Sequence, residues 1–173
     1  GFTKYTPAAG IAELKEAISK KFKEFNGLDY KPSQIVISNG GKHSLTNVFS
    51  VILNPGDEVI IPAPYWLSYP EIVKLADGVP VFVRGEKETG YKVNVEMLQA
   101  VTTDKTKALI LNTPSNPTGM IYTEDELRAI ADYAVKNDIY VVADEMYEYL
   151  VYNGKKHVSI ASFNEKIKDL TIV

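Results

Sequence analysis

Two polar segments of this chain follow short apolar runs of the kind that form buried parallel strands. Residues 112–119 (NTPSNPTG) come directly after the run 108–111, and residues 144–147 (DEMY) come directly after 140–143. The carboxyl ends of parallel strands form the edge of an α/β sheet at which small ligands bind. Amide, carboxylate and phenol groups placed at that edge can hold a polar ligand in one orientation.

In the first segment, Asn116 is the residue whose side chain could bind a ligand. Pro114 and Pro117 restrict the backbone around it, so its amide is held in one direction. A side-chain amide can donate a hydrogen bond to a phenolate-type oxygen. The alternative is an ordinary turn asparagine, which is common in segments rich in proline and glycine.

In the second segment, Asp144 ends the most hydrophobic predicted strand. A carboxylate there needs a partner, because an unpaired buried charge is costly, and a protonated pyridine nitrogen would serve. The alternative is that Asp144 caps a helix starting at Glu145. Glu145 should point away from Asp144, whereas Tyr147, about one helical turn further on, can face the same site.

Two further segments follow predicted strands. Gly40-Gly41-Lys42 opens a helix, where free backbone N–H groups and the helix dipole favour an anion such as a phosphate. The alternative is a plain strand-to-helix turn. Trp66, the only tryptophan, lies between Tyr65 and Tyr69 and can stack on a flat heteroaromatic ring. The alternative is a core or interface aromatic residue.

Helix and strand patterns alternate along the chain, which predicts a three-layer α/β/α fold around a mainly parallel sheet. Predicted helices span 11–25, 40–53, 66–75, 95–101 and 123–137, and predicted strands span 35–38, 58–62, 79–84, 107–111, 140–144 and 170–173. The helix at 123–137 begins with a capping box, Thr123 to Glu126. We interpret the 173 residues as one domain without an internal linker.

Composition excludes several classes of function. The net charge of −3 gives no basic surface for nucleic acid, and the absence of cysteine excludes disulfides and thiol catalysis. The two histidines, His43 and His157, are poor evidence for a metal site. No apolar run is long enough to cross a membrane. Both ends look cut, so we interpret the chain as part of a longer, cytoplasmic protein.

Together these segments resemble the class I aminotransferases, the aspartate aminotransferase-like branch of the fold type I enzymes that depend on pyridoxal 5'-phosphate (PLP). The resemblance follows the order of the segments over nearly the whole chain, and Asn116 to Gly119 is its most specific element. It implies that Asp144 pairs with the pyridine nitrogen of PLP. It also implies that Asn116 and Tyr147 bind the phenolic oxygen and that Trp66 stacks on the ring.

The same resemblance implies a phosphate cradle at Gly40, Gly41 and Lys42. It implies that Tyr5 reaches the phosphate of a neighbouring subunit in a homodimer, and that Asn116 also contacts substrate. Lys42 replaces the small hydroxyl residue of some members, and it could pair with a substrate carboxylate or be a surface lysine.

The implied reaction moves an amino group from an aspartate-like or aromatic amino acid to a 2-oxo acid. The resemblance places the family's Schiff-base lysine, substrate-binding arginine, N-terminal arm and small domain outside residues 1–173, which would form part of the large, PLP-binding domain. Lys166 and Lys168 precede the expected lysine and are not assigned its role, so the chain alone is expected to be inactive. The alternatives are a C–S β-lyase, the effector-sensing domain of a transcription regulator, and a structural domain without a ligand.

Overall fold

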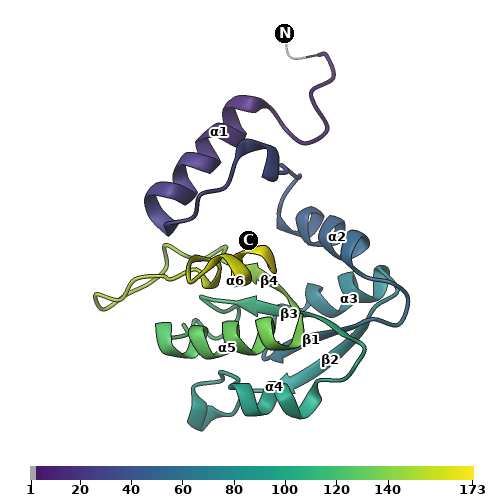
Figure 1. Ribbon diagram of the computed structural model, residues 1–173, viewed down its shortest axis with the longest axis vertical. Helices are drawn as coiled ribbons and strands as arrows, with labels where there is room; N and C mark the ends of the chain where they lie inside the picture. Colours follow the sequence, from purple (N-terminus) through teal and green to yellow (C-terminus); the bar gives the residue numbers. More distant parts are fainter. Residues whose placement is uncertain (1–2) are drawn as a thin grey trace.

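The computed structural model describes residues 3–173 (Figure 1). Its centre is a five-stranded sheet of order β2-β1-β3-β4-β5 in which every neighbouring pair is parallel. The strands are β1 (Glu58–Ala63), β2 (Val79–Arg84), β3 (Thr106–Asn112), β4 (Tyr140–Asp144) and β5 (Thr171–Ile172). The predicted α/β class and parallel sheet are therefore confirmed.

Helices connect the strands and cover both faces of the sheet. The α-helices are α1 (Ala12–Lys21), α2 (Gly41–Ile52), α3 (Ser68–Leu75), α4 (Val95–Val101), α5 (Glu124–Asn137) and α6 (Glu165–Asp169). Shorter helical turns are η1 (Phe22–Asn26), η2 (Pro32–Gln34), η3 (Lys87–Thr89) and η4 (Ile160–Ser162). Among residues 3–173, every helix is too short or too polar to span a membrane.

The three layers follow from the alternation of side chains along the strands. In β3, Ala108 and Ile110 belong to the core cluster that includes Phe49 of α2 and Val73 of α3. Their neighbours in sequence, including Leu109, pack in the opposite cluster with side chains of α4 and α5. Because successive strand residues point to opposite faces, one continuous apolar run supplies both cores.

The order of the strands creates a switch point between β1 and β3. From β1 the chain passes through α3 to β2 at one edge of the sheet, and from β3 it passes through α5 to β4 on the other side. The connections therefore leave β1 and β3 in opposite directions, which opens a crevice beyond their carboxyl ends. The segments after these two strands are the ones that carry Trp66 and Asn116.

One predicted strand is wrong. Residues 35–38 belong to no strand, and Val36 is largely exposed. The backbone N–H of Ile37 bonds to the carbonyl oxygen of Ala9 rather than to a sheet neighbour. An apolar β-branched run becomes a strand only where another strand lies beside it to complete the ladder.

The first predicted helix is confirmed, with a change of pitch near its end. α1 continues as the π-helical turn η1 and stops at Gly27, whose φ of 69° is the left-handed cap conformation. α1 has no buried residue, and both Leu14 and the preceding Ile11 are exposed. In Figure 1, α1 lies apart from the sheet and its covering helices.

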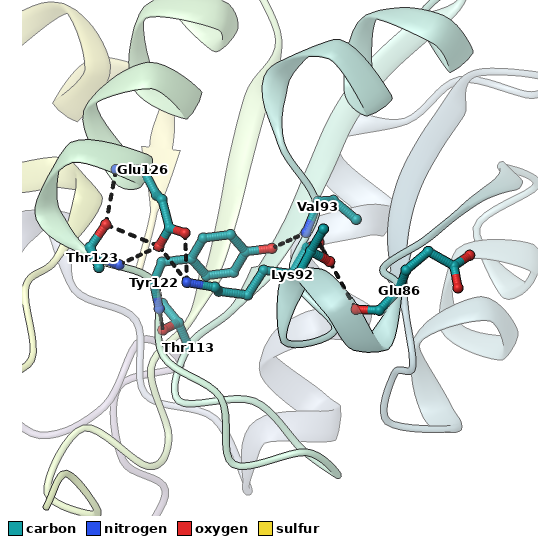
Figure 2. Close-up of polar contacts among 8 residues, drawn as sticks. Glu86, Lys92, Val93, Thr113, Tyr122, Thr123 and Glu126 are labelled. Carbon is teal, nitrogen blue, oxygen red and sulfur yellow. Dashed lines mark hydrogen bonds and ion pairs between the residues drawn. The ribbon is translucent and has the colours of Figure 1, made fainter.

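A polar cluster fixes the far end of the loop that carries Asn116 (Figure 2). Lys92 Nζ lies 2.5 and 2.7 Å from the two carboxylate oxygens of Glu126. The Tyr122 hydroxyl accepts a bond from the backbone N–H of Val93 at 3.0 Å, and the Tyr122 N–H donates to Thr113 Oγ1 at 3.3 Å. These bonds tie the start of α5 to the segment before α4 and hold both ends of the 113–122 loop.

Candidate cofactor site

A cavity of about 560 Å³ opens at the carboxyl edge of the sheet. It is bounded by the start of α2, the start of α3, the ends of β3 and β4, and the turn that follows β4. Its lining brings together most of the residues singled out in the sequence: Gly41, Lys42, Trp66, Asn116, Asp144 and Tyr147. Segments up to about one hundred residues apart therefore meet at one site, as the strand-edge argument predicts.

Asp144 accepts two hydrogen bonds at the wall of this cavity. The hydroxyl of Tyr69 donates to Oδ2 at 2.6 Å, and the backbone N–H of Met146 donates to Oδ1 at 3.1 Å. The second bond is the capping type of contact anticipated as the alternative, although residues 146–149 form a turn and not a helix. Both donors are neutral. Among the described residues, no cationic side chain pairs with Asp144.

The loop carrying Asn116 is held by a side chain whose role was not foreseen. Asn112, at the end of β3, donates to the carbonyl oxygens of Asp144 at 2.9 Å and Pro114 at 3.2 Å. Its Oδ1 accepts the backbone N–H of Asn116 at 2.8 Å. One amide thus ties the ends of β3 and β4 to the Asn116 loop. The sequence signal for this role is that the polar Asn112 directly follows the apolar run 108–111.

Trp66 and Lys42 line the same part of the cavity. Lys42 Nζ lies 5.3 Å from the centre of the indole ring, within cation–π range. Tyr69 meets Trp66 edge-on, with ring centres 5.4 Å apart. Tyr65 does not join them, because its ring stacks on Phe82 at 5.1 Å. The predicted aromatic cluster is therefore two rings at this cavity and one ring beside it.

The start of α2 presents backbone N–H groups at the cavity. Gly40 is its N-cap residue with φ 89°, a conformation that favours glycine, and no side chain caps the helix. The first-turn N–H groups of a helix have no carbonyl partner within it, so they can bind an anion. Gly41 and Lys42 line the cavity itself, whereas Gly40 forms the turn that precedes them.

The turn that carries Tyr147 is held on both sides by contacts of its acidic side chains. Before it, Glu145 Oε2 lies 2.9 Å from His157 Nε2. After it, Glu148 pairs with Lys21 of α1 and accepts a bond from the Asn26 amide at 3.0 Å. Burial alone would raise the pKa of Glu148, but the bonds from Asn26 and Lys21 outweigh it and lower that pKa. His157 lies only thirteen positions after Asp144, but neither spacing nor periodicity marked it as a partner of Glu145.

Other predicted residues lie elsewhere. Tyr5 is fully exposed and does not reach the cavity of its own chain. Lys166 and Lys168 lie in α6, and Lys168 pairs with Glu165 at 3.2 Å. Neither lysine lines the cavity.

The whole sequence, residues 1–173, matches the family Aminotransferase class I and II. The chain belongs to this family. It is 57% identical over 173 residues to an aspartate aminotransferase from Bacillus sp. (strain YM-2). The aligned region covers 100% of this chain and 44% of that protein. The chain thus spans less than half the length of the curated relatives it matches.

Solved structures of aminotransferases agree with this membership. A double mutant of Thermus thermophilus aspartate aminotransferase superposes with a TM-score of 0.93 at 45% identity, over 98% of this chain and 43% of the other. An aromatic aminotransferase from Pyrococcus horikoshii gives a TM-score of 0.91 at 42% identity, over 94% of this chain and 44% of the other. The fold is therefore that of fold type I, and the aminotransferases of this family depend on PLP.

Proposed function

We propose that this chain is part of the large, PLP-binding domain of an aminotransferase that moves an amino group from an amino acid to a 2-oxo acid. The observation that carries the proposal is the environment of Asp144. Its carboxylate lies at the wall of a cavity large enough for a small-molecule ligand and is bonded only by neutral donors. A negative charge so placed favours a ligand with a cationic nitrogen.

The residues around the cavity fit the parts of PLP. Asp144 would pair with the pyridine nitrogen, Trp66 would stack on the ring, and Asn116 and Tyr147 would donate to the phenolic oxygen. The first turn of α2, at Gly40, Gly41 and Lys42, would hold the phosphate. When bound, PLP supplies a cationic ring that accepts the electron pair left behind as the amino acid loses its α-proton.

The chain's own residues then position and polarise this group. Asp144 would keep the ring nitrogen protonated, Trp66 would stack on the ring, and the α2 amides would hold the phosphate. Asn112 keeps Asn116 in register with Asp144, because it bonds to the backbone of both. We expect the chain alone to be inactive, because the resemblance places the Schiff-base lysine and the substrate-binding arginine outside residues 1–173.

An aspartate-like substrate is supported by the relatives named aspartate aminotransferase and by Lys42, whose ammonium group lies at the cavity and can pair with a second carboxylate. Aromatic amino acids are the second candidate substrates, because one of the similar structures is an aromatic aminotransferase. We further propose a homodimer in which Tyr5, exposed in its own chain, reaches the phosphate of the neighbouring subunit. The cytoplasmic location stays a prediction.

The test is an assay of the longer protein that contains these residues, with aspartate and 2-oxoglutarate as substrates. We expect oxaloacetate and glutamate to form in equal amounts. In the Asp144→Ala variant the rate of their formation should fall on the order of 100-fold. The 173-residue chain alone should form neither. Release of pyruvate, ammonia and a thiol from a cysteine conjugate, without amino transfer, would reject the proposal in favour of a β-lyase.

A further inference from the structure

The hydroxyl of Tyr69 makes the shorter of the two hydrogen bonds to Asp144. It lies 2.6 Å from Oδ2, against 3.1 Å for the Met146 N–H and Oδ1. Tyr69 is 1% exposed, so water does not compete for this bond. Burial first, and then the charge of Asp144, raise the pKa of the Tyr69 phenol far above its ordinary value. The phenol therefore stays protonated and remains a donor at any working pH.

The same side chain contacts the second proposed ring partner. Tyr69 and Trp66 lie three residues apart at the start of α3, and their rings meet edge-on with an interplanar angle of 86°. Tyr69 thus contacts both Trp66, which would stack on the cofactor ring, and Asp144, which would pair with the ring nitrogen. A shift of this one residue would disturb both contacts together.

We propose that Tyr69 is a positioning residue that aims the ionised carboxylate of Asp144 at the pyridine nitrogen of PLP and keeps their shared proton on the ring. This rests on the proposed function, because it assumes that PLP occupies the cavity. A hydrogen bond to a carboxylate stabilises its charged form and lowers its affinity for a proton. The proton between Asp144 and the ring therefore remains on nitrogen, where it draws electrons into the ring.

The identity of the residue matters as much as its position. A lysine or a protonated histidine at position 69 would neutralise Asp144 and compete with the ring for its charge. A phenol gives the orienting bond without any formal charge, so the attraction between Asp144 and a cationic nitrogen is kept. This is a reason for a tyrosine at a site where other donors would also reach the carboxylate.

The first test is PLP titration of the 173-residue chain, followed by absorbance and by Trp66 fluorescence. Tyr69→Phe keeps the ring and removes only the hydroxyl, and we expect it to weaken PLP binding roughly tenfold, which is about 1.4 kcal/mol. Tyr65→Phe is the matched control, since Tyr65 stacks on Phe82 and does not line the main cavity.

The second test reads the proton directly, through the ¹⁵N signal of PLP labelled at the pyridine nitrogen. In Tyr69→Phe the signal should move toward that of unprotonated pyridine, and a residue that only packs would leave it unmoved. Incorporation of 3-fluorotyrosine at position 69, a stronger donor of the same shape, should move it the opposite way. If Tyr69→Phe does not fold, the fluorotyrosine measurement decides alone, and an unmoved signal overturns the proposal.

Failure of this inference differs from failure of the proposed function. If the wild-type chain binds PLP and Asp144→Ala loses it, while Tyr69→Phe equals the wild type in affinity and ¹⁵N signal, only the role of Tyr69 is overturned. If the wild-type chain shows no saturable binding, the cofactor site itself is overturned together with the role of Tyr69.

Discussion

The carboxylate of Glu145 and the imidazole of His157 face each other at 2.9 Å, with side chains only 6% and 8% exposed. Glu145 Oε2 and His157 Nε2 have no hydrogen-bond partner elsewhere among the described residues. At this distance the imidazole is the polar partner of the buried Glu145 carboxylate, and a buried polar contact of this kind is costly to break. The pair fastens the turn carrying Tyr147 to the segment after residue 150.

Removing one member of this pair should destabilise the protein strongly. His157→Gln takes the imidazole away from the buried Glu145 side chain, and we expect it to lower the free energy of unfolding by about 3 kcal/mol. Urea unfolding followed by circular dichroism measures this. The double variant Glu145→Gln/His157→Gln should recover part of the loss. As a control, Glu71→Gln breaks an exposed pair with Lys74 and should change stability by less than about 1 kcal/mol. Equal effects of His157→Gln and Glu71→Gln would contradict this account.

The capping box at the start of α5 gives a second prediction. Thr123 Oγ1 accepts the N–H of Glu126 at 3.3 Å, and Glu126 Oε2 accepts the N–H of Thr123 at 2.7 Å (Figure 2). Thr123→Ala removes the first bond and should cost about 1 kcal/mol in chemical denaturation. Thr123→Ser keeps the hydroxyl and serves as the control. An alanine variant as stable as the serine variant would show that the cap contributes nothing.

Acid should weaken the fold through Glu126 and Glu148. Burial alone would raise the pKa of Glu126, but hydrogen bonds from Lys92 and Thr123 outweigh it and lower that pKa below 4.5, and the pKa of Glu148 is lowered as well. Carboxylates whose pKa is lower in the folded state stabilise it above the unfolded-state pKa, and this contribution is lost as the pH falls through the folded-state pKa.

The free energy of unfolding should therefore fall as the pH goes from about 5 to about 3. The fall should be smaller in Glu126→Gln/Glu148→Gln, measured as urea midpoints at several pH values. Glu13→Gln, at an exposed position on α1, is the control and should follow the wild type. A double variant with the wild-type slope would count against this assignment.

Gly85, after β2, should tolerate no side chain. An added Cβ would lie 2.4 Å from the backbone carbonyl carbon and oxygen of Tyr91, and backbone atoms cannot rotate away. We expect Gly85→Ala to lower stability by about 2 kcal/mol. Gly41→Ala is the matched control for stability, because its Cβ would meet no atom within 4 Å. Equal urea midpoints for Gly85→Ala and Gly41→Ala would contradict the prediction.

Much of the fold follows from local pattern. The limits of β4 and α4 agree residue for residue with the predicted ranges 140–144 and 95–101, because apolar runs and helical spacing carry that information. The run 35–38 has the same apolar character, but it has no neighbouring strand, and sequence pattern does not report pairing. α1 was predicted from its spacing, but that spacing does not reveal that its apolar face is left uncovered.

Some features of the candidate site could be predicted from the sequence, and others could not. The meeting of Asn116, Asp144 and Tyr147 at one cavity could be predicted, since each lies at or just after the end of a recognisable strand and strands of one parallel sheet end at the same edge. Tyr69 and Asn112 could not be assigned as partners of Asp144, because those bonds join residues 75 and 32 positions apart. Their partners become known only once the order of the strands is known.

The central claim, that Asp144 and its neighbours form a PLP site, is tested most directly by titrating the chain with PLP and comparing wild type with Asp144→Ala. The account predicts saturable binding that raises or quenches Trp66 fluorescence and is lost or greatly weakened in the variant. Borohydride reduction followed by peptide mapping should find no lysine modified in proportion to that binding. Binding of equal strength in both proteins, or none in the wild type, would contradict the account.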